Sequence, residues 1–189
     1  MSWRRRPALR CPAPPPPDPL PSAVAFAPLY LRTEYGLAFG SASKSVALFG
    51  LGGLLSNVVW GRFYEAAGRR QRRVATAAST AALTAMCAAL AAHAFGAVAL
   101  SLQGTLAAIF GIGFTFAGPY YVPSQVIVVT RAGDRTATVS GVIDALGFVA
   151  VCVLNYQCQT LRWRTAWGFL TGMSAVAGVS LLKAMSYDE

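Results

Sequence analysis

The chain has 189 residues, of which 55% are hydrophobic and 12% are charged, and its mean hydropathy is +0.49. A soluble domain this apolar would have too little polar surface, so the composition excludes an ordinary soluble enzyme or binding module. The net charge of +9 does not indicate nucleic-acid binding, because the basic residues stand in short clusters between apolar runs. We therefore expect an all-α, multi-pass integral membrane protein whose charges set its topology.

The first 20 residues differ in composition from the rest of the chain. They are rich in arginine and proline, which predicts a disordered cytoplasmic tail because such a segment can bury little apolar surface. The remainder, 21–189, is expected to form one domain. Its cysteines have no paired spacing, so packed, reduced thiols are expected in place of disulfides or a metal site.

Six apolar segments are long enough to predict membrane-spanning helices. Their expected bounds are near 21–37, 43–64, 74–95, 98–129, 137–160 and 166–185. The fourth segment is longer than a straight crossing of about 30 Å requires. We therefore expect Gly118 and Pro119 to break this helix and to face the interior of the bundle, either as a packed kink or as part of a cavity. His93, at the end of the third segment, is expected to be an interfacial residue, with a proton carrier as the alternative.

A basic stretch at 61–73 separates two uncharged apolar runs. Its arginines can be hydrated only if this stretch is a tight loop between two crossings, and their number predicts that the loop is cytoplasmic. With this orientation, twelve of the 16 basic residues and both termini fall on the cytoplasmic side. A cysteine engineered at position 71 should then label from the cytoplasm, and one at position 163 from the opposite side.

The same stretch contains a spaced pattern formed by Gly61, Glu65, Gly68, Arg69 and Arg70. This pattern resembles the loop motif of the major facilitator superfamily, in which an acidic residue between two glycines is followed by bases. The resemblance implies a conformational role, because the acid can pair with a base in one transporter state. We expect Glu65 to approach an arginine of its own loop or of the turn at Arg131; a solvated acid is the alternative.

Three further stretches narrow the resemblance. Residues 26–31, the step Gly118-Pro119-Tyr120 and residues 142–147 are similar to the second half of the sugar-phosphate exchangers, which are organophosphate antiporters. This implies helices seven to twelve of a twelve-helix carrier that exchanges a phosphorylated sugar or similar organic anion by alternating access. It also implies substrate or cavity roles for Asp144, Pro119 and Tyr120.

Asp144 is the only charged residue between Thr136 and Leu161. A carboxylate within a membrane helix is expected to face the bundle interior or water. We expect Asp144 to line the central cavity and to act in substrate handling or proton coupling. A buried acid satisfied by neighbouring hydroxyls is the alternative.

The expected partners are the lipid bilayer and a small organic anion, with phosphate or a proton as the coupled species, and a missing or separate amino-terminal half. Neither nucleic acid nor a cofactor or metal is expected. A complete carrier needs both halves, so the alternative is a non-transporting, truncated membrane protein that acts as a helix-packing scaffold or partner subunit. An enzyme is not expected, because no His/Glu cluster, serine elbow or metal-ligand spacing is found in the sequence.

Overall fold

The computed structural model describes residues 26–142, 144–145, 149, 152 and 163–186, and its described elements are all helical. They are α1 (Phe26–Tyr35), α2 (Phe39–Ala66), α3 (Arg69–Ala94), α4 (Leu102–Ala132), the short 3₁₀ helix η2 (Gly133–Arg135) and α6 (Trp163–Ser186). Within these ranges, four helices are long and apolar enough to cross a membrane: Phe39–Ala66, Arg69–Ala94, Leu102–Tyr121 and Trp163–Lys183. The protein is therefore an integral membrane protein.

The remaining two expected crossings lie partly outside the described residues. The first corresponds to α1, which is described from Phe26 onward. The fifth is described only at 136–142, 144–145, 149 and 152, all of which are helical. Six crossings therefore stay a prediction, and the four long helices are the part that the structure supports.

The connection between α2 and α3 is much shorter than the expected loop at 61–73. Only Ala67 and Gly68 lie outside the helices. The Gln71 side-chain oxygen accepts a hydrogen bond from the Gly68 N–H at 3.0 Å, which helps to begin α3. Because arginine and glutamine are good helix formers, the basic segment continues as helix beyond the apolar run. The expectation of a loop over this whole stretch was wrong.

Helix α4 runs without interruption from Leu102 to Ala132. The expected interruption of the helix at Gly118 and Pro119 is therefore not found, and contacts from neighbouring helices, described below, explain its continuity. A kink at this point stays a prediction. The chain leaves α4 at Gly133, whose φ of 50° lies in the left-handed region that favours glycine. The helical segment that begins at Thr136 follows this turn.

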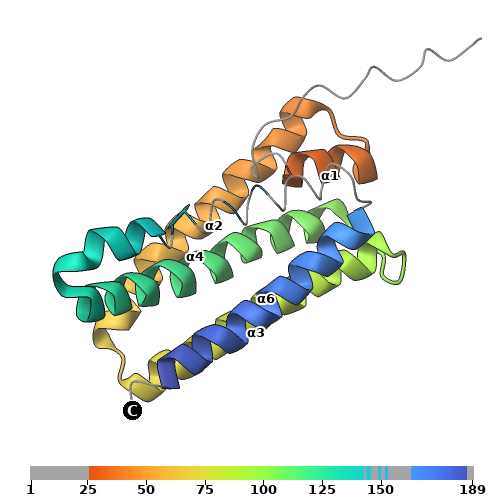
Figure 1. Cartoon of the computed structure of the whole chain (residues 1–189). Helices are drawn as coiled ribbons and strands as arrows, with labels where there is room; N and C mark the ends of the chain where they lie inside the picture. Colours follow the sequence, from red (N-terminus) through yellow and green to blue (C-terminus); the bar gives the residue numbers. More distant parts are fainter. Residues whose placement is uncertain (1–25, 143, 146–148, 150–151, 153–162, 187–189) are drawn as a thin grey trace, which may run out of the picture.

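Two pairs of long helices lie side by side, α2 with α4 and α3 with α6 (Figure 1). Glycines bring α2 and α4 into close contact. A Cβ atom on Gly52 would meet the backbone oxygen of Phe110, and one on Gly113 would meet the backbone oxygen of Phe49. Close packing through small residues is typical of membrane helices, because the hydrophobic effect does not drive helices together within lipid.

Helix α6 packs on α3 through both a glycine and hydroxyl groups. The position of a Cβ on Gly178 lies 3.1 Å from the Thr80 side chain, and the Ser174 hydroxyl donates to Thr84 Oγ1 at 3.1 Å. By contrast, Gly168 and Gly172 have open space where a Cβ would lie. Only part of the glycine face of α6 is therefore used within the described chain.

A buried cluster joins α1, α3, α4 and α6 at the end of the bundle away from the α2–α3 connection. It includes Tyr30, Leu90, Ile109 and Trp167. The Tyr30 ring meets Trp163 and Trp167 edge-on, with centroids 5.5 and 5.4 Å apart. Such aromatic contacts add to the packing energy of the cluster and fix the ends of these helices relative to one another.

Candidate functional site

Pro119 removes one backbone hydrogen bond from α4, and α3 replaces it. Because proline has no N–H, the carbonyl of Thr115, four residues earlier, loses its usual helical donor. The hydroxyl of Ser79 on α3 donates to that carbonyl at 3.0 Å. This hydrogen bond explains why α4 continues past Pro119 in surroundings where water cannot serve.

Helix α2 also contacts α4 next to Pro119. The Gly118 N–H donates to the hydroxyl of Ser56 at 2.9 Å, and Ser56 is fully buried. The Trp60 ring lies so close to Gly118 that a Cβ there would collide with it. Gly118 and Pro119 are both buried, as expected for residues that face the bundle.

Neither serine was predicted from the sequence. Ser56 stands beside Asn57, and Ser79 is one of several hydroxyl residues in its helix, with Thr76 and Thr80 close by. That is a weak signal, because a membrane serine more often bonds to its own helix, as Ser43 does with Phe39 O at 2.8 Å. Only the packing of α2 and α3 on α4 shows where Ser56 and Ser79 act.

The structure brings Tyr120 and Asp144 together although they lie on different helical segments. Tyr120 is half-buried, stacks on Phe116 with centroids 5.1 Å apart, and meets the Tyr121 ring edge-on. Asp144 lies close enough to interact electrostatically with Tyr120. The three residues singled out for the cavity, Pro119, Tyr120 and Asp144, therefore lie in one region.

The side chain of Asp144 is exposed within the described part of the chain. Tyr120 follows Leu102 by eighteen residues, about 27 Å along α4. The pair therefore lies toward the end of the crossing that the positive-inside rule places on the cytoplasmic side.

The motif residues lie around the short α2–α3 connection. Arg69 and Arg70 occupy the first turn of α3, where positive charges are disfavoured by the helix dipole by about 0.3–1 kcal/mol each. Helix stability therefore does not account for them; the positive-inside rule predicts such residues at a cytoplasmic helix end. Arg72 lies over the Tyr64 ring, 4.3 Å from its centroid, and so links the two helices across the connection.

Glu65 is exposed in the last turn of α2. Among the described side chains it forms no ion pair, so the expected contact with an arginine of its own stretch is not found in this structure. The side chain of Arg131 lies outside the described ones. Gly61 lies one turn before Glu65, and a Cβ there would meet open space.

A second polar cluster lies at the opposite end of the bundle. The Tyr35 hydroxyl contacts Thr105 Oγ1 at 2.6 Å and His93 Nε2 at 3.0 Å, and it donates to Leu100 O at 3.0 Å. His93 Nδ1 lies 3.1 Å from the Leu100 backbone nitrogen and 3.0 Å from the Val98 carbonyl oxygen. His93 thereby joins α1, α3 and the start of α4, a structural role at the helix ends.

Within the described ranges, no group of three or more His, Cys, Asp or Glu residues could hold a metal ion. In comparisons with known proteins, the family model described as Major Facilitator Superfamily matches residues 20–155 of the chain. No curated protein matches, and no solved structure matches.

Proposed function

The chain belongs to the major facilitator superfamily, and we propose that it forms a six-helix half of a carrier that exchanges a phosphorylated sugar or a similar organic anion. The family and the four apolar helices support a membrane transporter, and members of this superfamily are typically transporters rather than enzymes. The substrate class and the exchange mechanism rest on the resemblance of Gly118-Pro119-Tyr120 and Asp144 to the sugar-phosphate exchangers. The second half required by such a carrier is a proposed partner.

The observation that carries the proposal is the exposed carboxylate of Asp144, within electrostatic range of Tyr120. An aspartate at the centre of a membrane costs about 2.5–3.5 kcal/mol on insertion scales, and near the end of a crossing, where Asp144 lies, a carboxylate still favours water over lipid. Its exposed face is therefore better placed toward water or another protein. We infer that this face lines the inner half of the transport cavity, where a carboxylate and a phenol can bind sugar hydroxyls.

A phosphate group also needs a positive partner. The described crossing Leu102–Tyr121 carries no basic residue. The cation that binds the phosphate is therefore proposed to come from the second half, with Asp144 and Tyr120 contacting the sugar or carrying the coupled proton.

The α2–α3 connection is proposed to serve as a conformational lock. Gly61, Glu65, Gly68, Arg69 and Arg70 lie within a short distance along the chain, on two helices joined by only two residues. Because Glu65 is exposed and unpaired among the described side chains, it is available to pair with a base in another transporter state.

The test is exchange by the full chain in proteoliposomes loaded with inorganic phosphate, with labelled glucose 6-phosphate outside. Asp144→Asn removes the negative charge while keeping the shape. We expect the exchange rate to fall about ten- to hundredfold, the range for a lost hydrogen bond to a charged group. Asp134→Asn, at an exposed acid in η2, is the matched control and should keep the wild-type rate.

Wild-type rate and pH dependence in Asp144→Asn would leave that residue with no transport role. Exchange only after a second six-helix half is added would support a separate partner. No exchange in either case would favour the non-transporting partner subunit over the carrier.

A further inference from the structure

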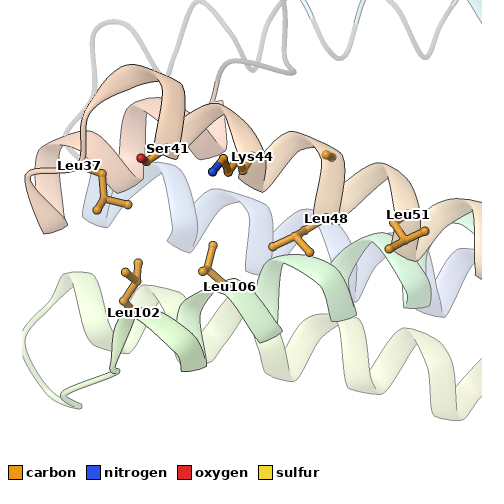
Figure 2. Close-up of a pocket in the computed structure, with 8 residues that line it drawn as sticks. Leu37, Ser41, Lys44, Leu48, Leu51, Leu102 and Leu106 are labelled. Carbon is orange, nitrogen blue, oxygen red and sulfur yellow. The ribbon is translucent and has the colours of Figure 1, made fainter.

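A pocket of about 520 Å³ lies between the beginnings of α2 and α4. Most of its wall is leucine: Leu48 and Leu51 come from α2, and Leu102 and Leu106 from α4 (Figure 2). A pocket of this size is within the range that holds small ligands. Its apolar wall fits a hydrocarbon chain.

One end of the pocket is polar. Ser41 and Lys44 line it from α2, one turn apart and therefore on the same face of the helix. Within the described part of the chain, neither side chain has a hydrogen bond or an ion pair. One end of the pocket thus offers an ammonium group and a hydroxyl group that have no partner among the described residues. The rest of its wall is mostly leucine.

The depth of Lys44 in the membrane follows from the length of α2. Its 28 residues span about 42 Å, whereas the hydrocarbon core is about 30 Å thick, so about 6 Å extends beyond the core at each end. Lys44 follows Phe39 by five residues, about 7.5 Å, so its backbone lies about 1.5 Å inside the edge of the core. Its long side chain can extend from there to the lipid headgroups. Leu48 and Leu51 lie one and two turns deeper, at the level of the acyl chains.

We propose that this pocket binds an anionic lipid, with its acyl chain along the leucines and its phosphate on Lys44 and Ser41. A free, water-soluble organic anion would match the ammonium but would leave the leucine wall without an apolar partner. A zwitterionic lipid would match the wall but would gain less from the ammonium. The site is separate from the proposed transport face, because Tyr120 lies about 27 Å along α4 from Leu102.

The test uses native mass spectrometry of the full chain in detergent, with phosphatidylglycerol and phosphatidylcholine of identical acyl chains as probes. The wild type should bind phosphatidylglycerol about fivefold more tightly, the effect of one basic residue near an anionic headgroup. Lys44→Met should abolish this preference and Lys44→Arg should retain it. Lys183→Met, at the chain's other lysine, is the matched control and should leave the preference unchanged.

A second variant tests the acyl-chain part of the site. Leu106→Trp fills the space between α2 and α4, so it should weaken the binding of both lipids. Equal affinity of the wild type for the two lipids, an equal loss in Lys183→Met, or unchanged binding in Leu106→Trp would each overturn the proposal. Displacement of the lipid by glycerol 3-phosphate would also overturn it, because the pocket would then recognise a water-soluble anion.

Discussion

Ser79 supplies the hydrogen bond that water would supply at a proline in a soluble helix, and Ser56 forms a hydrogen bond with the glycine before that proline. One accepts from the Gly118 N–H and the other donates to the Thr115 carbonyl, so both neighbours of α4 take part. In hydrocarbon an unsatisfied backbone group costs several kcal/mol, so a membrane proline needs such partners. The Ser79 hydroxyl therefore satisfies the carbonyl that Pro119 leaves without a donor, and Ser56 links α2 to the same part of α4.

Removal of the Ser79 hydroxyl should destabilise the bundle. In Ser79→Ala the carbonyl of Thr115 loses its donor, and we expect the free energy of unfolding to fall by about 1–2 kcal/mol. Denaturant unfolding in detergent micelles measures this change. Ser43→Ala is the control, because the Ser43 hydroxyl bonds to Phe39 O within its own helix; equal losses in the two variants would contradict the role assigned to Ser79.

Glycines have different packing roles in the different helices. Gly52 and Gly113 let the backbones of α2 and α4 meet, and Gly178 accommodates Thr80 of α3 on α6. Gly168 and Gly172 on α6 have no neighbour where a Cβ would lie. The α2–α4 contact is thus the one in which loss of a small residue should move whole helices apart.

Gly113→Ala should separate α2 from α4. The added Cβ would collide with the backbone oxygen of Phe49, which cannot rotate away as a side chain could, so we expect a loss of about 1–3 kcal/mol in unfolding free energy. Gly172→Ala adds the same atom in open space and should be neutral or should stabilise α6 by up to about 1 kcal/mol. The difference between the two melting temperatures in detergent measures the effect; similar values would rule out the close contact as its cause.

For the molecule as a whole, the sequence correctly predicted where the long helices lie. The apolar runs around Leu54, Leu83 and Val176 predicted α2, α3 and α6, because a lipid-exposed helix must be apolar around its surface. Their ends were harder to predict. Arginines at 69–73 break the apolar run but favour helix, so α3 begins at Arg69 and not after the basic stretch.

The candidate site was predictable in part for the same physical reasons. Asp144 and Pro119 stand out because a charge or a proline in a membrane helix is energetically costly. Such residues are therefore found mainly where they have a function or where neighbouring groups satisfy them. Their partners Tyr120, Ser56 and Ser79 are ordinary residues whose importance comes from position. The lipid pocket was not predicted at all, because Lys44 and Leu106 are far apart in sequence.

The orientation of the molecule in its membrane is the last prediction. Gln71 lies in the first turn of α3 and Thr165 near the start of α6, and both are exposed. Arg164 Nε donates to Ala94 O at 2.9 Å, so α6 begins beside the end of α3, a 26-residue helix that is about 39 Å long. The two positions therefore lie at opposite ends of the bundle, and the arginines beside Gln71 predict that its end is cytoplasmic.

In a chain whose native cysteines are replaced, Gln71→Cys and Thr165→Cys report the two ends. A membrane-impermeant maleimide added to intact cells should label Thr165→Cys at once and Gln71→Cys only after permeabilisation. Labelling of both from one side would contradict the packing of α6 on α3 across the membrane. A reversed pattern would keep the fold but would show that the arginines of α3 do not set its orientation, and the face with Tyr120 and Asp144 would then open to the outer side.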